Sequence, residues 1–265
     1  MAGKATTNNT SGSQLGGLTD SSANAAAPFF AMAASWDGTA STPLSSGQYS
    51  YSQAIQFYDN NGTLQNGTIY YDLAGTENGK TAVEYVVALD DASLDGSSLA
   101  GTKAAGLLMA GTLTFSSAGE LQNMTAFTPP SSGDPADLTS WSSASVVNGS
   151  PAFTVTVAGS GTQSIGLDMG LTLTGSAASG PVNAAAASAD PSSIYAVNTS
   201  ATRTSTASNP YGETTGIPSQ TMTGHAVGAL TDTTVAPAAA TAGTYRHRQT
   251  ADRHQAPPDP TPPAG

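Results

Sequence analysis

The sequence predicts an all-β protein: an antiparallel β-sandwich or small barrel, with a second, smaller β region and disordered termini. Three observations support this fold class. Short segments alternate apolar and polar residues with the period of two that a β-strand requires. Clusters of Gly, Asn and Ser separate these segments at the spacing of hairpin turns. No segment shows the i, i+3, i+4 apolar spacing of an amphipathic helix.

The first predicted strand covers residues 49–58. Its apolar side chains share one face: Tyr49, Tyr51, Ile55 and Phe57. Two Asn-Gly pairs follow, Asn61-Gly62 and Asn66-Gly67, and the chain returns as a strand over 68–72. Asn-Gly supplies the positive-φ residues that a tight hairpin turn needs, so we predict structural turns at both pairs.

Further strands follow the same alternation. Residues 82–89 place Val83, Tyr85, Val87 and Leu89 on one face and Glu84 on the other. Strands over 107–115 and 121–127 flank a Ser-Ser-Ala-Gly turn, and later strands contain Phe153, Val155 and Val157, then every odd position from Ile165 to Leu173. Additional turn-forming residues are Gly111 and Gly119. We predict that six residues pack in the core: Phe57, Tyr70, Tyr85, Leu113, Phe115 and Leu167.

These segments divide the chain into four parts. Residues 1–44 are predicted to form a flexible lead-in with a partial strand. Its residues 1–27 are polar and small, and its apolar stretch 25–35 docks onto the first domain. Residues 45–175 form the main β domain, and 176–245 form a smaller β-rich region with weak strand signals at 226–230, 233–235 and 241–245. Residues 246–265, rich in Arg, His and Pro, are predicted to be disordered.

Composition excludes several functional classes. The 265 residues include no Cys, which rules out disulfides and thiolate metal sites. Seven Lys and Arg stand against 18 Asp and Glu, a net charge of −11, so we expect no nucleic-acid partner and no membrane partner. The N-terminal residues lack the apolar region of a secretory signal peptide, so an extracellular location would require export by another route. With three His and seven basic residues, we expect no catalytic site, no metal site and no cofactor.

Two segments partly match the motifs of functional sites. Residues 91–96, Asp-Ala-Ser-Leu-Asp-Gly, match the opening of a calcium loop, but Thr102 stands where the bidentate Glu belongs, which favours a solvated loop. Ser164 lies in Gly-Thr-Gln-Ser-Ile-Gly, where the upstream Gly is one position too far for a nucleophile elbow.

Other candidate residues have equally simple interpretations. His225, His247 and His254 lie far from any paired carboxylates. Asn-x-Ser/Thr sequons, among them those at Asn8, Asn61, Asn66, Asn123, Asn148 and Asn198, are explained by turn chemistry unless a host glycosylates them. Trp36 and Trp141 could stack on sugars, although single Trp residues at domain edges more often anchor packing.

Several segments together resemble the bacterial flagellar hook protein. The segment 54–72, AIQFYDNNGTLQNGTIYYD, is similar to the family's strand-turn-strand segment, and AVEYVVALD (82–90) to its next strand. Residues 105–129 resemble its following unit, with five positions in register: Gly111, Leu113, Phe115, Gly119 and Leu121. Residues 163–172 and 219–235 resemble later strands, the last through Ser219, Gln220, Gly228, Leu230 and Val235.

The resemblance implies the outer, β-rich part of a hook subunit, a structural protein of the flagellum without enzymatic activity. It implies partners: other hook subunits in a homopolymer, and hook cap, rod and hook–filament junction proteins. The family's terminal helical segments are missing, Thr221–Gly224 replace its Asp-Gly, and the chain after Tyr245 departs from the family pattern. Since those helices hold subunits together, we expect this chain to be monomeric in solution.

Two alternatives remain open at this point. One is an extracellular adhesin or carbohydrate-binding β-domain, which rests on the two Trp residues and the Ser/Thr-rich composition. The other is a secreted hydrolase, which rests on the imperfect motif around Ser164.

Overall fold

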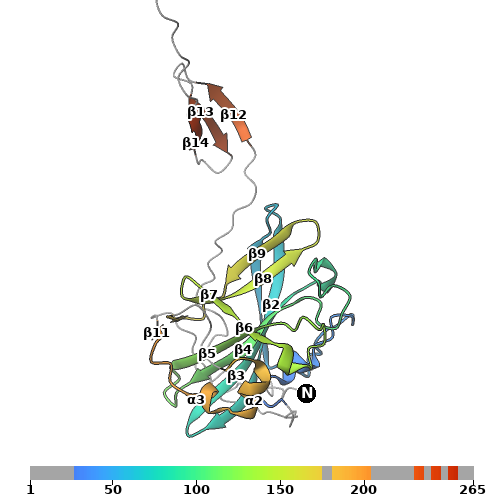
Figure 1. Cartoon of the computed structure of the whole chain (residues 1–265), viewed down its shortest axis with the longest axis vertical. Coiled ribbons are helices and arrows are strands. Elements are labelled where there is room, and N and C mark those ends of the chain that lie inside the picture. The colour runs from blue at the N-terminus through green and yellow to red at the C-terminus, as the bar shows by residue number, and fades with distance from the viewer. Residues whose placement is uncertain (1–26, 175–180, 204–229, 236–239, 246–249, 256–265) are drawn as a thin grey trace, which may run out of the picture.

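The computed structural model describes residues 27–174, 181–203, 230–235, 240–245 and 250–255 (Figure 1). These residues form a six-stranded antiparallel sheet, a three-stranded sheet, a two-stranded pair and a second three-stranded sheet. Helices are few and short. The predicted all-β fold class is confirmed.

The six-stranded central sheet is built in chain order, each strand antiparallel to the next. Its strands are β1 (Tyr51–Tyr58), β2 (Leu64–Glu77), β3 (Lys80–Leu89), β4 (Leu107–Phe115), β5 (Leu121–Thr128) and β6 (Ser142–Ser143). Because β1 and β6 do not pair with each other, the sheet is open and the barrel alternative is wrong. Each strand pairs with the next strand in the chain, although the longer segments 90–106 and 129–141 connect β3 to β4 and β5 to β6.

One face of the central sheet packs against the three-stranded sheet of β7 (Ser145–Val147), β8 (Ser150–Val157) and β9 (Gly161–Gly166). Alternate residues of β3 and β8 meet in this sandwich core, among them Tyr85 and Phe153, each almost completely buried. Such a pair of apolar inner faces is how a β-sandwich removes its side chains from water.

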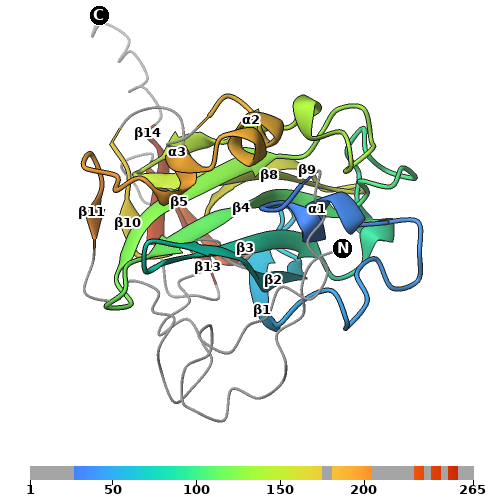
Figure 2. The same cartoon turned by 90° about the horizontal axis from the view of Figure 1, so that it is seen from below.

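The other face carries short helices: α1 (Ala31–Ser35), η2 (Leu138–Ser140), α2 (Ala184–Ala189) and α3 (Ser192–Tyr195). Figure 2 shows α2 and α3 lying along β5. Apolar residues of these helices form a second core with the even-numbered side chains of β3, and Phe30 stacks edge-on against Phe127 at 5.4 Å between ring centroids. The central sheet is therefore buried on both faces.

The second core corrects the prediction for the N-terminal region. Residues 27–44 were expected to belong to a flexible lead-in with a partial strand, but they contain the helix α1, and Phe30, Met32 and Trp36 are buried against the sheet. The expected docking of 25–35 is seen for the described residues 27–35. Residues 1–26 lie outside the described part.

Tight turns connect most strands of the sandwich. Two are two-residue turns with both residues at positive φ: Asn78-Gly79 between β2 and β3 (φ 50° and 77°), and Asn148-Gly149 between β7 and β8 (φ 52° and 81°). Asn-Gly is the sequence that this turn type prefers. Neither turn was predicted.

The predicted strand from Ile165 to Leu173 is wrong as a single element. β9 ends at Gly166, Gly170 has a φ of 91°, and β10 (Leu171–Thr172) then pairs with β11 (Thr202–Arg203). The odd-numbered side chains nevertheless reach the same sandwich core, because Leu167, Met169, Leu171 and Leu173 are all buried there.

The remaining strands lie near the C-terminus. β12 (Leu230–Val235), β13 (Ala240–Tyr245) and β14 (Thr250–Gln255) form an antiparallel sheet of their own. β14 falls within the stretch predicted as disordered, so that prediction is wrong for residues 250–255. The predicted strand at 226–230 lies outside the described residues except for Leu230. In the part of the chain that the structure describes, no helix has the length and apolar character needed to cross a membrane.

Phe115 provides a test of the sandwich core. It is 1% exposed at the end of β4, so Phe115→Ala should lower the free energy of unfolding by about 3–5 kcal/mol through lost burial and the cavity left behind. The measurement is chemical denaturation. Val182→Ala, at a residue that is 78% exposed, is the control and should change stability by less than about 0.5 kcal/mol. Equal stability of the two variants would contradict a core position for Phe115.

Candidate functional site

A row of four buried polar side chains crosses the helix-facing side of the central sheet. Asp72, Glu84, Thr112 and Thr125 stand opposite one another in register from β2 to β5. The hydroxyl groups of Thr112 and Thr125 form a hydrogen bond with each other, with 2.7 Å between their oxygens. Buried polar groups need such partners, because an unpaired one costs most of its hydration free energy.

Glu84 finds its partners in α1. Its two carboxyl oxygens accept hydrogen bonds from the backbone N–H groups of Met32 (3.0 Å) and Ala33 (2.9 Å). Burial raises the pKa of Glu84 to about 8; the hydrogen bonds from α1 oppose this change, and the neighbouring Asp72 adds to it. The predicted alternation placed Glu84 on the face away from the core, but it lies beneath a helix.

A second group of polar side chains holds α3. Thr114 Oγ1 donates to the Ile194 carbonyl (2.8 Å), and Asn123 Nδ2 lies within 2.9 and 3.0 Å of the Ser193 and Ile194 carbonyls. Lys80 Nζ donates to the Tyr195 carbonyl at 2.7 Å. These carbonyls belong to the last turn of a helix, where no intrahelical donor remains. The sheet thus supplies the partners that two short helices lack.

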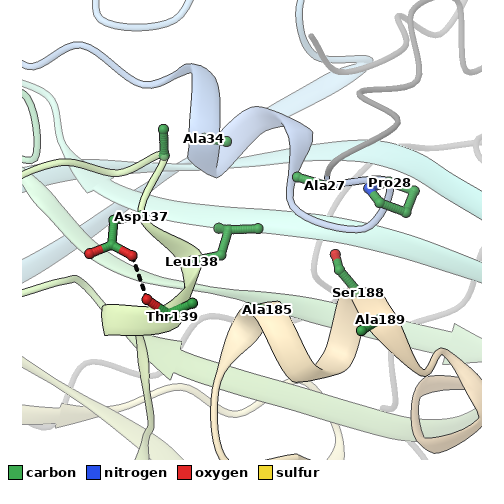
Figure 3. A pocket seen from close by; sticks show the side chains of 10 residues that line it. Ala27, Pro28, Ala34, Asp137, Leu138, Thr139, Ala185, Ser188 and Ala189 are labelled. Atoms are coloured by element: carbon green, nitrogen blue, oxygen red, sulfur yellow. Dashed lines mark hydrogen bonds between the residues drawn. The ribbon is translucent and has the colours of Figure 1, made fainter.

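A groove of about 510 Å³ opens between α1, η2 and α2 (Figure 3). The Asp137 carboxylate accepts from Thr139 Oγ1 at 2.6 Å and from the Ser140 hydroxyl, and these two bonds lower its pKa. The Ser188 hydroxyl is buried without a hydrogen-bond partner. The residues that line the groove are Ala27, Pro28, Ala34, Ala136, Asp137, Leu138, Thr139, Ala185, Ser188 and Ala189. These include no His, Lys or Cys, and the one carboxylate among them, Asp137, already accepts hydrogen bonds from Thr139 and Ser140.

At the opposite end of the sandwich, the β1–β2 and β8–β9 hairpin tips are joined. Asn60 Nδ2 donates to the Thr162 carbonyl (2.9 Å), Asn61 Nδ2 to the Gly159 carbonyl (3.2 Å), and Gln163 Nε2 to the Tyr58 carbonyl (2.6 Å). Beneath them, burial raises the pKa of Asp59, but hydrogen bonds from the Thr63 backbone and the Gln65 side chain outweigh it and lower the pKa overall. These contacts fix the two sheets relative to each other.

The six residues predicted for the core divide between the two faces. Five are buried in the sandwich core: Phe57, Tyr85, Leu113, Phe115 and Leu167. Tyr70 is not among them. It is half-buried on the helix-facing side, where its ring contacts Tyr49 (4.9 Å between centroids) and Trp36 (6.2 Å). Tyr49 therefore also lies on the opposite side from the rest of its predicted face.

The six residues predicted for turns divide as well. Asn61 and Gly62 lie in the β1–β2 turn, where Gly62 has a φ of 73°, and Gly119 lies in the β4–β5 turn with a φ of 79°. The second turn at Asn66-Gly67 is wrong, because both residues lie inside β2, paired with Gln56 and Ile55.

Gly111 forms no turn either, since it lies in the middle of β4. A Cβ at this position would overlap the Thr125 carbonyl oxygen and approach the Tyr85 hydroxyl to 2.7 Å. The missing side chain lets the Tyr85 phenol cross β4 and donate to that carbonyl at 2.9 Å. Burial raises the pKa of Tyr85, so the phenol stays a neutral donor. Sequence inspection identified the glycine but assigned it the wrong role.

The segment 91–96, which matches the opening of a calcium loop, uses its carboxylates in hydrogen bonds within the protein. Asp91 Oδ1 accepts from the Ser93 backbone and hydroxyl, and Asp95 accepts from the backbone N–H groups of Ser97 and Gly106. Among the residues that the structure describes, no group of three His, Cys, Asp or Glu side chains is placed to hold a metal ion. Ser164 lies exposed on β9 opposite Thr154, in a strand and not on the sharp turn that a nucleophile elbow requires.

Both Trp residues are packing anchors. Trp36 and Trp141 are 3% and 1% exposed, and their indole N–H groups donate to the Ala105 (3.0 Å) and Pro135 (3.1 Å) carbonyls. Among the sequons, Asn123 is buried and bonded to α3, whereas Asn61, Asn66 and Asn148 are exposed; Asn8 lies outside the described residues. His225 and His247 also lie outside them, and His254 belongs to β14.

A family model described as the flagellar basal body protein FlaE D2 domain matches residues 24–209. This match spans both sheets of the sandwich, all three α-helices and the β10–β11 pair. No curated protein and no solved structure matches the chain.

Gly111 provides a test of the close approach between β4 and β5. Gly111→Ala should lower the free energy of unfolding by about 1–3 kcal/mol or more, because the added methyl group must displace backbone or the Tyr85 phenol. Thermal and denaturant unfolding would measure this. Gly47→Ala is the matched control, since a Cβ there meets only Ser45 Oγ at 4.0 Å and should be tolerated. If both variants unfold alike, the packing described for Gly111 is incorrect.

Proposed function

Because the chain belongs to the family of the flagellar basal body protein FlaE D2 domain, we propose that it is a structural subunit, or part of one, of the bacterial flagellar hook, the curved joint between basal body and filament. Membership by itself implies a component of the hook or basal body in the bacterial flagellum. The family is structural and not enzymatic.

The observation that carries the proposal is the extent of the family match. Residues 24–209 include the whole sandwich and the helices that cover it, so the shared feature is a complete packed unit and not a single hairpin. The resemblance of residues 54–129 to hook proteins lies within this region and includes β1 to β5. The specific choice of the hook over other basal body parts rests on that resemblance.

The described surface suits a structural role. The one carboxyl group that lines the groove, Asp137, is held by hydrogen bonds from Thr139 and Ser140, and the sandwich is held by hydrogen bonds and apolar packing. As partners, we propose further copies of the hook subunit, together with hook cap, rod and hook–filament junction proteins. As a location, we propose the extracellular part of the flagellum.

No observation favours the carbohydrate-binding alternative. It required Trp36 or Trp141 to present an indole face to a sugar, and both side chains are buried with their N–H groups bonded to backbone carbonyls. Stacking on a sugar needs an exposed ring.

Immunogold electron microscopy of the source bacterium tests the proposal, using antibody raised against residues 45–175. We expect gold confined to the short curved segment between the cell body and the filament. Purified flagella with hooks attached should label at the same place, and antibody preabsorbed with the protein should remove the signal.

Gold over the whole envelope, or on cells that carry no flagella, would overturn the hook assignment. Gold on the rod within isolated basal bodies would instead leave the family assignment in place and reject the hook in favour of another basal body component.

A further inference from the structure

Two carboxyl groups lie together beneath α1 in the centre of the protein. Asp72 and Glu84 are directly opposed in the β2–β3 register and are 1% and 2% exposed. Directly opposed side chains on one face of an antiparallel pair have Cβ atoms about 4.5–5.5 Å apart. Two acids at that separation, out of contact with water, cannot both ionise without a large electrostatic cost.

The main chain of α1 covers this pair of carboxyl groups. Met32 and Ala33 are fully buried, and their N–H groups donate to the two oxygens of Glu84 at 3.0 and 2.9 Å. α1 is only five residues long, and a helix of that length is unstable without tertiary contacts. Its attachment therefore depends on Glu84 and on the apolar contacts on either side.

The Asp72 carboxyl group accepts a hydrogen bond from the Ser50 hydroxyl, and among the described elements that pack against Glu84 no basic side chain faces the Glu84 carboxyl group. No residue of α1, β4 or β5 has a charged side chain. The titratable groups on this side of the sheet also include the phenols of Tyr195 in α3 and Tyr70 in β2. Lys80, on the same strand as Glu84, donates its ammonium to the Tyr195 carbonyl. The charge facing Glu84 is thus that of Asp72.

We propose that Asp72 and Glu84 form a proton-dependent latch: the pair retains a proton while α1 is docked, and loss of that proton in neutral to mildly alkaline solution releases residues 27–36 from the sheet. The sheet itself stays folded, because its sandwich core on the other face does not depend on α1. The latch is a local opening of a small segment, of the kind that costs less than global unfolding.

The direction of the pH dependence follows from the pKa of Glu84 in the two states. In the docked state burial raises this pKa to about 8, whereas a released, solvated Glu84 has the ordinary value of 4.5. Docking is therefore strongest below pH 4.5 and weakens as the pH rises toward 8. Between these two pH values, the equilibrium constant for docking of α1 falls by up to about tenfold per pH unit, as expected when release is coupled to the loss of one proton.

The direct test is hydrogen–deuterium exchange of the Met32 and Ala33 amides in the full chain. After correction for intrinsic exchange, their protection should fall by at least about tenfold between pH 5 and pH 9, the minimum for one pKa unit of linkage. In Glu84→Gln, which keeps the shape and carries no charge, protection should not change with pH. Glu77→Gln makes the same change at an exposed Glu on the end of β2 and should behave as the unmodified chain.

Two further measurements make the result specific. Asp72→Asn removes the neighbouring negative charge and so lowers the pKa of Glu84 in the docked state. In this variant the loss of Met32 and Ala33 amide protection should be smaller and should be complete at a lower pH. Trp36 follows α1 directly and is one of two Trp residues. In a Trp141→Phe background its emission should shift to longer wavelength as the pH rises, while far-ultraviolet circular dichroism stays constant.

Amide protection that is constant from pH 5 to 9 in the unmodified chain would overturn the latch. So would a loss of protection that is equal in Glu84→Gln. If Trp141→Phe does not fold, the exchange measurement alone decides, since it needs no change at either Trp. None of these outcomes depends on where the protein is located in the flagellum.

Discussion

The burial of both faces of the central sheet is the constraint on which the rest of the structure depends. One face has the ordinary solution, an apolar sandwich with β7, β8 and β9. The other face carries a polar row that begins with Asp72 and Glu84 and would be costly in an apolar environment. Short helical segments cover this face. The free N–H groups of α1 donate to Glu84 of the row, and the carbonyl groups of α3 accept hydrogen bonds from Thr114 and Asn123 on the same sheet.

This arrangement explains why such short helices are stable. α1, α2 and α3 have five, six and four residues, too few for an isolated helix in water. Each is fixed from outside: α1 by Glu84, α3 by Thr114 and Asn123, and α2 by Ala184 and Ala187 in the second core. The helices in turn exclude water from the polar row. A structural subunit gains rigidity from this mutual dependence, while the buried carboxyl group of Glu84 makes the docking of α1 responsive to pH.

Much of the β structure could be predicted because its signals are local. The alternation in residues 82–89 and 107–115 and the turn at Asn61-Gly62 appear in the structure as β3, β4 and the β1–β2 turn. The same local rule failed at Asn66-Gly67, where pairing with β1 keeps the chain extended, and it overlooked Asn78-Gly79. Of the candidate site, the predicted core residues were found but the polar row was not, because Thr112, Thr125 and Glu84 look like solvent-facing positions of half-buried strands.

The period-two strands, the absence of disulfides and the resemblance to hook proteins can each be read from neighbouring residues or from composition alone. Which strand faces are covered depends on the tertiary structure. It placed Tyr70 and Tyr85 in different cores, gave Gly111 a packing role, and brought Met32 and Ala33 to Glu84 across about fifty intervening residues. The physical reason is that burial and hydrogen-bond satisfaction depend on contacts between distant segments, which no local pattern contains.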